Sequence, residues 1–393
     1  MTTPDAAAEL PDDLVQRVQR RLAAERARPD PVALARAVRA ESTAVVDDAR
    51  MLTLIRRLET ELVGCGPLTP LLADPRTTDV VVNGPSDVRV DRGDGWERTS
   101  ISFGDDQAVQ RLARRLAGVA GQRLDDARPF VDGRLPDGTR LHAVLPPVAS
   151  SGTCLSLRVL RPATYDLPAL HRRGMLPGSC LPALRAILRA RLAFLVSGGT
   201  GSGKTTLLGA LLAGMDPAER IVTVEDAEEL HPPHPHVVRL VARAANVEGA
   251  GAVPVRELVR QALRMRPDRL VVGEVRGPEV VDLLGALGTG HDGGAGTVHA
   301  NSAADVPARL AALAALGGMA PAAMHAQLAG AVQVVLHLRR SGGVRRLAEI
   351  AVLTSQPGQP VRALPALLDG APAGEGAGLL AARLADRGVP APW

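Results

Sequence analysis

The 393 residues are 46% hydrophobic and 22% charged, a composition that suits two or three domains with buried cores and excludes an intrinsically disordered chain. The net charge is only +4 and aromatic residues make up 2% of the chain, which leaves little to stack bases on, so no nucleic-acid partner is expected. Three cysteines without paired spacing argue against disulfides and a zinc site, and an acidic N-terminus without signal-peptide order predicts a cytoplasmic protein.

Two regions come first in the chain. Residues 1–60 combine charged and apolar side chains at helical spacing and are expected to form a solvated helical N-terminal region. Residues 61–162 change to short alternating runs such as DVVVNG and VRVDRG, with one helical stretch in DDQAVQRLARRLAGVAG. This pattern predicts a smaller α+β N-terminal domain. Residues 163–182, with several prolines and glycines, are expected to be a linker.

The pattern changes again at residue 183. From there to residue 355, apolar strands such as LAFLVSG and RLVVGEV alternate with helices such as TTLLGALLAG, which indicates an α/β domain with a mostly parallel sheet covered on both faces. Residues 310–338 contain no charged side chain, but their histidines, glutamines and proline favour two packed helices and a strand over a membrane span. The Pro-, Ala- and Gly-rich residues 356–393 predict a loosely held tail.

The stretch SGGTGSGKTT contains Lys204, the only lysine of the chain, and fits the phosphate-binding pattern GxxxxGK[ST] between a strand and a helix. Its glycines allow backbone N–H groups to converge on phosphate oxygens at a helix N-terminus. We expect Lys204 between the β- and γ-phosphates of ATP and the Thr205 hydroxyl on Mg²⁺. GxGxG spacing argues against a dinucleotide site. The predicted nucleotide-binding residues are Gly198, Gly199, Thr200, Gly201, Ser202, Gly203, Lys204, Thr205 and Thr206.

Two acidic clusters follow apolar strands. In IVTVEDAEEL, Glu225 ends the strand and Glu229 follows one short turn later, and in RLVVGEVRG the strand ends at Glu274. Carboxylates at the ends of parallel strands can hold Mg²⁺ or orient a water for attack on the γ-phosphate. Glu274 is the first choice for the general base, with Glu225 and Glu229 as further catalytic candidates. Thr205, Glu225 and Glu274 are the candidate Mg²⁺ ligands. Helix capping stays an alternative for any acid of the first cluster, above all for Asp226 and Glu228.

The histidines form two groups. GTGHDGGAGTVHANS places His291 in a glycine-rich loop and His299 in the strand after it, where a histidine can sense the γ-phosphate, although a loop histidine without a role is the alternative. The segment HPPHPH, residues 231–236, invites a metal interpretation. Its prolines favour an extended, exposed chain and no cysteine or acidic ligand accompanies it, so the composition argues against a metal site.

In order and spacing these stretches, with GPLTPLLADPRTTDVVVNGP and RPFVDGRLPDGTRLHAVLPPV upstream, resemble the type II/type IV secretion ATPases, and most closely the actinobacterial form of the Tad (Flp) pilus assembly branch. The resemblance covers residues 50–355. It implies a RecA-like P-loop core, an aspartate box at 221–229, a Walker B strand ending in Glu274 and a histidine box at 288–301. The tetracysteine zinc motif of many pilus-extension relatives is missing, which points to the Tad branch or to the effector-secreting type IV branch.

The resemblance also implies how such a protein works. It would be a homohexameric ATP hydrolase, peripheral at the cytoplasmic membrane through an integral-membrane platform protein, and it would power pilus assembly or protein secretion. The family lends arginines of the N-terminal domain to the nucleotide, and Arg134, Arg140 and Arg158 stand where such residues are expected. From the residues alone, surface positions are an alternative for all three.

Two other classes share this kind of core. A nucleic-acid-translocating RecA-like ATPase would require a basic groove that carries aromatic side chains, which the composition does not supply. A nucleotide-gated switch without useful turnover would not need two acidic residues in the positions of Glu225 and Glu274. The residues therefore favour a secretion motor over both.

Overall fold

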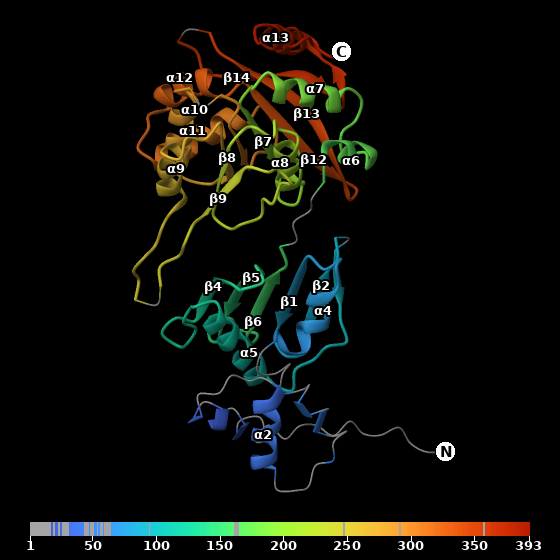
Figure 1. Ribbon diagram of the computed structural model, residues 1–393, viewed down its shortest axis with the longest axis vertical. Helices are drawn as coiled ribbons and strands as arrows, with labels where there is room; N and C mark the ends of the chain where they lie inside the picture. Colours follow the sequence, from blue (N-terminus) through green and yellow to red (C-terminus); the bar gives the residue numbers. More distant parts are fainter. Residues whose placement is uncertain are drawn as a thin grey trace, which may run out of the picture. The chain divides into compact units, whose positions relative to one another are not determined.

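The computed structural model describes residues 17–18, 20–22, 24–25, 31–42, 47, 51–52, 54–55, 58, 64–93, 95–160, 165–246, 248–290, 292–356 and 358–393. The chain divides into two compact units, Met1–Leu160 and Arg161–Trp393 (Figure 1). The predicted α/β class is confirmed, since strands and helices alternate along the second unit.

The first unit contains a helical part and a sheet. In the helical part, α2 (Pro31–Glu41) packs through Leu34 and Val38 in a small apolar cluster. The sheet has the order β3-β2-β1-β6-β5-β4 and all its pairs are antiparallel. Its strands are β1 (Asp79–Asn83), β2 (Val88–Asp91), β3 (Trp96–Arg98), β4 (Phe130–Arg134), β5 (Arg140–Val144) and β6 (Cys154–Arg158).

One face of this sheet carries the core of the first unit. The alternating residues of its strands and the apolar stripe of α5 (Asp106–Val119) form a single cluster. Asp105 caps α5 by accepting a hydrogen bond from the N–H of Ala108 at 2.7 Å, which satisfies one of the free amides of the helix N-terminus. A 3-10 turn (Gly66–Leu68) and α4 (Thr69–Ala73) precede β1, and Leu68 joins the same cluster.

The second unit is built on a nine-stranded sheet with the order β15-β14-β13-β12-β7-β11-β10-β8-β9. The six strands from β12 to β9 run parallel, and β12 to β15 pair antiparallel. The strands are β7 (Phe194–Gly198), β8 (Ile221–Glu225), β9 (Val237–Val241), β10 (Arg269–Val275), β11 (Ala295–Val298), β12 (Val334–Ser341), β13 (Val344–Thr354), β14 (Arg362–Leu368) and β15 (Ala371–Pro372).

Helices cover both faces of this sheet, as expected for parallel strands that are buried on both sides. One apolar cluster joins the sheet to α6 (Leu167–Arg172), α7 (Cys180–Arg189), α8 (Lys204–Ala213) and α13 (Gly374–Ala385). The other joins it to α9 (Val255–Leu263), α10 (Glu279–Leu287), α11 (Val306–Leu316) and α12 (Pro321–Ala331). The prediction of two helices and a strand within residues 310–338 is confirmed by α11, α12 and β12, and no helix among the described residues is long and apolar enough to cross a membrane.

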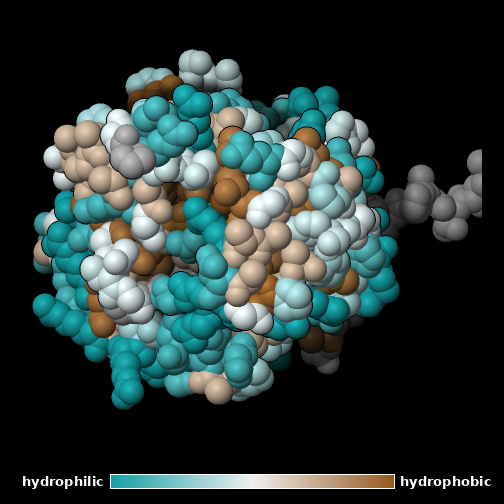
Figure 2. All heavy atoms as spheres, turned by 90° about the horizontal axis from the view of Figure 1, so that it is seen from above, coloured by the Kyte–Doolittle hydropathy of each residue, from teal (hydrophilic) through white to brown (hydrophobic). Residues whose placement is uncertain are grey.

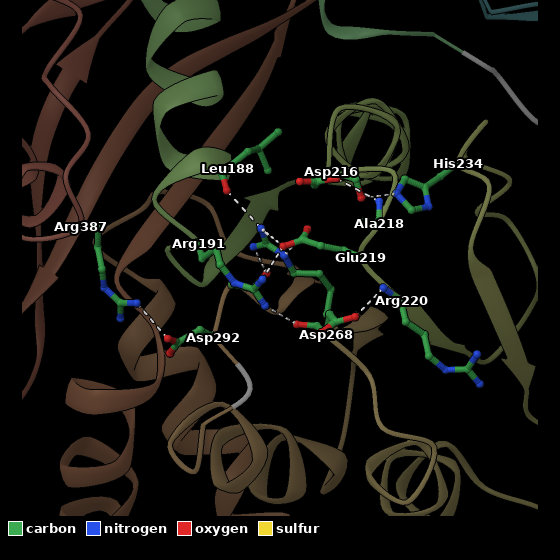
Figure 3. Close-up of polar contacts among 12 residues, drawn as sticks. Leu188, Arg191, Asp216, Ala218, Glu219, Arg220, His234, Asp268, Asp292 and Arg387 are labelled. Atoms are coloured by element: carbon green, nitrogen blue, oxygen red, sulfur yellow. Dashed lines mark hydrogen bonds and ion pairs between the residues drawn. The ribbon is translucent and has the colours of Figure 1, made fainter.

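A buried arginine ties the strands together at one end of the sheet. Arg269, the first residue of β10, is 2% exposed and donates to both carboxylate oxygens of Glu219 at 2.9 and 3.0 Å. It also donates to the carbonyls of Gly293 and Leu188, at 3.0 and 3.1 Å. Arg191 donates to the same glutamate at 2.6 Å, and Figure 3 shows Leu188, Arg191 and Glu219 converging. The buried charge is therefore paired and hydrogen-bonded, as burial requires.

The C-terminal residues continue this sheet, so the prediction of a loosely held tail is wrong. β14 pairs with β13, and α13 packs through Leu380 and Leu384, which are fully buried. After α13, Arg387 donates to Asp292 at 2.8 Å. An Ala- and Gly-rich composition contains few large apolar side chains whose spacing could predict a helix or a strand, but it does not prevent strand pairing or helix packing. Figure 2 views the molecule from the end that carries α13, and hydrophobic side chains lie among hydrophilic ones on that face.

The segment expected to be a linker also contributes to the second unit. Within residues 163–182, Asp166 caps α6 by accepting a hydrogen bond from the N–H of Ala169 at 2.7 Å. Leu167 and Leu170 of this helix are buried in the same cluster as α8. Prolines and glycines here mark the ends of short helices, whereas the division between the two units falls after Leu160.

We predict that Leu384→Ala lowers the free energy of unfolding by about 2–5 kcal/mol, because the substitution leaves a cavity in a closed core. Leu316→Ala in α11 is the matched control, since that leucine is 69% exposed and its loss should cost within about 0.5 kcal/mol. Urea denaturation followed by circular dichroism measures both. Equal stability of the two variants would show that α13 is not packed on the sheet.

Candidate functional site

Four neighbouring strands, β7, β11, β10 and β8, end at the same edge of the parallel sheet. The predicted phosphate loop follows β7 at this edge. Gly198, Gly201 and Gly203 have positive φ angles of 148°, 70° and 96°, which glycine adopts without strain. A Cβ on Gly198 would lie only 2.6 Å from the carbonyl oxygen of Leu338, so no other residue fits there. Since α8 begins at Lys204, its free N–H groups face the loop and favour an anion.

The ammonium of Lys204 is held across this loop. Its Nζ donates to the carbonyl oxygens of Gly198 and Gly199, both at 3.0 Å, and lies 3.3 Å from Nδ1 of His299. The side chain is buried, and this burial lowers the pKa of Lys204 from its usual value. Such a compact cation, from which burial removes water, interacts strongly with phosphate oxygens at a helix N-terminus.

Glu225, the last residue of β8, is turned into the protein. Its carboxylate accepts hydrogen bonds from the N–H groups of Glu229 and Leu230 at 3.0 and 3.2 Å. Burial raises the pKa of Glu225 to about 7. A Cβ on Gly273 of β10 would lie 2.7 Å from Cγ of this glutamate, so the glycine leaves room for it. Glu225 therefore shapes the turn that carries Glu229.

Glu229 is the acid that reaches the phosphate loop. The hydroxyl of Thr205 donates to its Oε2 at 3.1 Å. A hydroxyl and a carboxylate side by side supply the hard oxygen ligands that Mg²⁺ prefers, so these two residues fit a magnesium ion beside the loop better than Thr205 and Glu225 do. No group of three or more acidic, histidine or cysteine side chains among the described residues is arranged to hold a metal by itself.

Glu274, near the end of β10, lies between Arg276 and His299. Its Oε2 accepts a hydrogen bond from Nη2 of Arg276 at 2.7 Å, and its Oε1 lies 2.8 Å from Nε2 of His299. Burial alone would raise the pKa of Glu274, but the hydrogen bond and the positive charge of Arg276, with smaller effects of His299 and Lys204, lower it overall. The carboxylate is thus kept ionised, as a general base or a water-orienting group requires.

His299 follows β11 and connects Lys204 to Glu274. Burial and the charge of Lys204 lower the pKa of this histidine. A neutral ring that accepts from the ammonium at Nδ1 carries its hydrogen at Nε2, a tautomer assigned from the network. This Nε2 lies 2.8 Å from Glu274 Oε1, although Oε1 makes no hydrogen bond of regular geometry. Lysine, histidine and glutamate therefore form one polar chain across three strand ends.

His291 lies outside the described residues. The loop residues beside it, Asp292 and Gly293, precede β11 and so lie at the end of that strand opposite to His299. They contact Arg387 and Arg269 there. The described part of this glycine-rich loop is therefore not at the phosphate edge, because a loop that enters a parallel strand lies at the other end of the sheet.

The three candidate arginines of the first unit are brought together on its sheet. Arg134 of β4 pairs with Arg140 of β5, which pairs with Arg158 of β6. Directly opposed residues of antiparallel strands place their side chains on the same face. This face is opposite to the core. Leu141 follows Arg140 in β5 and Leu157 precedes Arg158 in β6, and both leucines are buried. The row of arginines continues through Asp79 of β1 to Asp91 of β2.

Two residues of the phosphate edge escaped the sequence analysis. Arg276 could have been found, because it follows Glu274 by two residues and an extended chain places both side chains on one side. His337 of β12 could not, since its partner is 140 residues away: its Nδ1 lies 3.0 Å from Oγ of Ser197, directly before the phosphate loop.

The proline-rich histidines hold no metal cluster in the described chain. His234 and His236 instead contact Asp216 and Arg220.

Comparison with known proteins identifies the family. Residues 61–353 match the family described as Type II/IV secretion system protein. A putative conjugal transfer protein of Mycobacterium tuberculosis H37Rv is 62% identical over 322 residues, which are 80% of this chain and 92% of that protein. VirB11 of Agrobacterium fabrum is 32% identical over 72% of this chain and 91% of its own. The chain therefore belongs to the type II/IV secretion system protein family, and the predicted resemblance is confirmed at the level of this family.

Solved structures support the same fold. The pilus retraction motor PilT with bound ADP matches with a TM-score of 0.52 and 21% identity, over 74% of this chain and 82% of that one. The Legionella pneumophila ATPase DotB matches with a TM-score of 0.50 and 18% identity, over 77% and 79%. At these identities the likeness concerns the fold.

We predict a pH dependence of stability that originates in Glu225. Its pKa of about 7 lies above the ordinary value of 4.5, so the folded state binds this proton more tightly than the unfolded state. The contribution to stability is present below pH 4.5 and is lost as pH rises through 7. Glu225→Gln should not lose this contribution as pH rises. The difference in free energy of unfolding between the variant and the parent should therefore shift in favour of the variant by roughly 1–3 kcal/mol from pH 4.5 to pH 8.

Urea denaturation at a series of pH values measures this difference. The exposed Glu375→Gln is the control for removal of a carboxylate elsewhere in the same unit. Parallel pH profiles of the parent and Glu225→Gln would show that the buried carboxyl is not protonated in the folded protein.

Proposed function

We propose that this protein is the ATP-hydrolysing motor of a pilus-assembly or protein-secretion machine, of the Tad branch of its family. As a member of the type II/IV secretion family with a complete phosphate loop, it is a P-loop ATP hydrolase. Its second unit is a RecA-like core. The observation that carries the proposal is the polar chain from Lys204 through His299 to Glu274, beside the positive-φ glycines of the phosphate loop.

The residues divide the work on the nucleotide between them. The loop amides and Lys204 bind the phosphates, and the Thr205 hydroxyl with Glu229 holds Mg²⁺, which neutralises phosphate charge when bound. Glu274 orients the attacking water and accepts its proton. Because His299 contacts both Lys204 and Glu274, movement of the ammonium toward a phosphate is coupled to the position of the carboxylate.

The relatives support the finer assignment. One is named a conjugal transfer protein, one is a pilus retraction motor, and DotB is named an ATPase. By analogy with this group, we assign the chain to a homohexamer that works in the cytoplasm, peripheral to the membrane through an integral-membrane platform protein. A nucleic acid is not part of this assignment.

The arginine row of the first unit fits a role toward the nucleotide. Arg134, Arg140 and Arg158 occupy directly opposed strand positions, so three guanidinium groups belong to one face of the sheet. Asp79 and Asp91 continue the same row on β1 and β2. A triphosphate contacted in the same or a neighbouring subunit carries the negative charge that guanidinium groups bind, and the contact would gain stabilisation as charge develops in the transition state.

Two substitutions separate binding from chemistry. Lys204→Ala should lose ATP affinity and turnover, because the phosphates are left poorly neutralised. Glu274→Gln should bind ATP like the parent and lose turnover by about 10²–10⁴-fold, since an amide cannot accept the proton. Equilibrium binding of a fluorescent ATP analogue and a phosphate-release assay measure the two effects. Normal hydrolysis by Lys204→Ala would contradict the proposed function, and loss of binding by Glu274→Gln would make that residue structural.

We further predict that at least one of Arg134→Ala, Arg140→Ala and Arg158→Ala reduces turnover at saturating ATP by at least tenfold, roughly, while ATP affinity changes less. Arg98→Ala on the edge strand β3 of the same sheet is the control. Gel filtration shows whether the assembly is kept. If all three variants hydrolyse ATP at the parent rate, the arginine row takes no part in the chemistry.

A further inference from the structure

An arginine-rich hairpin connects β12 to β13 in the second unit. Its eight residues, 339–346, read RRSGGVRR and contain no acidic residue. Arg339 pairs with Arg346 and Arg340 pairs with Arg345, across the two-residue turn of Gly342 and Gly343, whose φ angles are 56° and 81°. Like charges directly opposite each other destabilise a strand pair. The hairpin therefore concentrates four positive charges at one turn.

The register places this hairpin at the phosphate loop. β12 runs parallel to β7, and the last pair between them joins Leu338 to Gly198, the residue at which β7 turns into the loop. Arg339, Arg340 and Ser341 continue in the same direction, so they extend about 10 Å past the end of β7 at the usual rise per residue. The hairpin thus projects beyond the sheet on the side of the loop.

Strand alternation divides the four arginines into two pairs. Arg340 and Arg345 share a face with Leu338 and Leu347, which are buried in the cluster that contains α8, the helix that follows the phosphate loop. Arg339 and Arg346 face the other way and line a pocket of about 420 Å³ together with Asp369. The two pairs therefore meet different surroundings although they belong to one turn.

Two close approaches confirm the direction of the first pair. A Cβ on Gly201 would lie 3.5 Å from Nη1 of Arg340, and a Cβ on Gly203 would lie 3.4 Å from Cδ of Arg345. Both glycines belong to the phosphate loop itself. Both arginine side chains therefore lie beside the phosphate loop.

We propose that Arg340 and Arg345 form a second phosphate-binding element, which contacts the terminal phosphates of the nucleotide held in the loop of the same subunit. This inference rests on the proposed function. A nucleoside triphosphate carries several negative charges, and Lys204 supplies one positive charge inside the loop. Guanidinium groups bind phosphate oxygens through paired, charge-assisted hydrogen bonds, and long arginine side chains at the rim can turn inward over a bound nucleotide.

The two faces of the hairpin supply a matched experiment. Arg340→Ala/Arg345→Ala removes the pair at the loop, and Arg339→Ala/Arg346→Ala removes the same charge from the same turn on the opposite face. Binding of fluorescent ATP, ADP and AMP analogues with Mg²⁺ is measured for the parent and both variants. We expect the first variant to bind ATP at least tenfold more weakly, roughly the worth of one hydrogen bond to a charged group, and to bind AMP as the parent does. The second variant should stay within about twofold for all three ligands.

The outcomes separate this inference from the proposed function. If the parent binds ATP, Lys204→Ala does not, and both hairpin variants bind equally well, the inference is overturned while the proposed function stands. An equal loss in both hairpin variants also overturns it, because the effect would then reflect net charge alone. If Lys204→Ala binds ATP as the parent does, the proposed function fails and the inference with it. Thermal unfolding without nucleotide checks the fold, and neither double variant should melt lower than the parent.

Discussion

The buried ion pair between Arg269 and Glu219 sets the position of the strand that carries the predicted general base. Arg269 begins β10 and Glu274 lies near the other end of the same strand. Four hydrogen bonds from the guanidinium join the first residue of β10 to Glu219, to the carbonyl of Leu188 in α7 and to the carbonyl of Gly293 in the loop before β11. Removal of Glu219 would leave an unpaired charge in the core, which costs several kcal/mol, roughly 3–5.

The same constraint reaches the neighbouring loop through a glycine. A Cβ on Gly293 would lie 1.7 Å from Nη1 of Arg269, so only glycine leaves space for the guanidinium. At the opposite edge, Gly273 makes space for Glu225 in a similar way. Glycines at both ends of the strands therefore leave space for charged side chains. The high glycine content of the sequence results from packing as well as from phosphate binding.

Much of the fold and the site could be predicted from local patterns. The phosphate loop, the parallel α/β class and the helices and strand of residues 310–338 follow from spacing and hydrophobic periodicity, which reflect interactions within a few residues. The hydrogen bond between Thr205 and Glu229 and the inward position of Glu225 could not be predicted. Which of the two acids reaches the phosphate loop depends on which one the turn buries. The tail was misjudged for a related reason: α13 is rich in Ala and Gly and is held mainly by the few leucines that the sheet buries.

The sequence by itself determined the class of chemistry, since Lys204, Thr205 and the acids at strand ends are required by the reaction and occur at spacings that depend only on chain geometry. The tertiary structure alone decided which side chains meet. His337 beside Ser197, Arg269 with Glu219 and the hairpin arginines at the phosphate loop are contacts between segments distant in sequence. The physical reason is that strand order and register, which set those contacts, arise from packing of the whole sheet and leave no short-range signal in the chain.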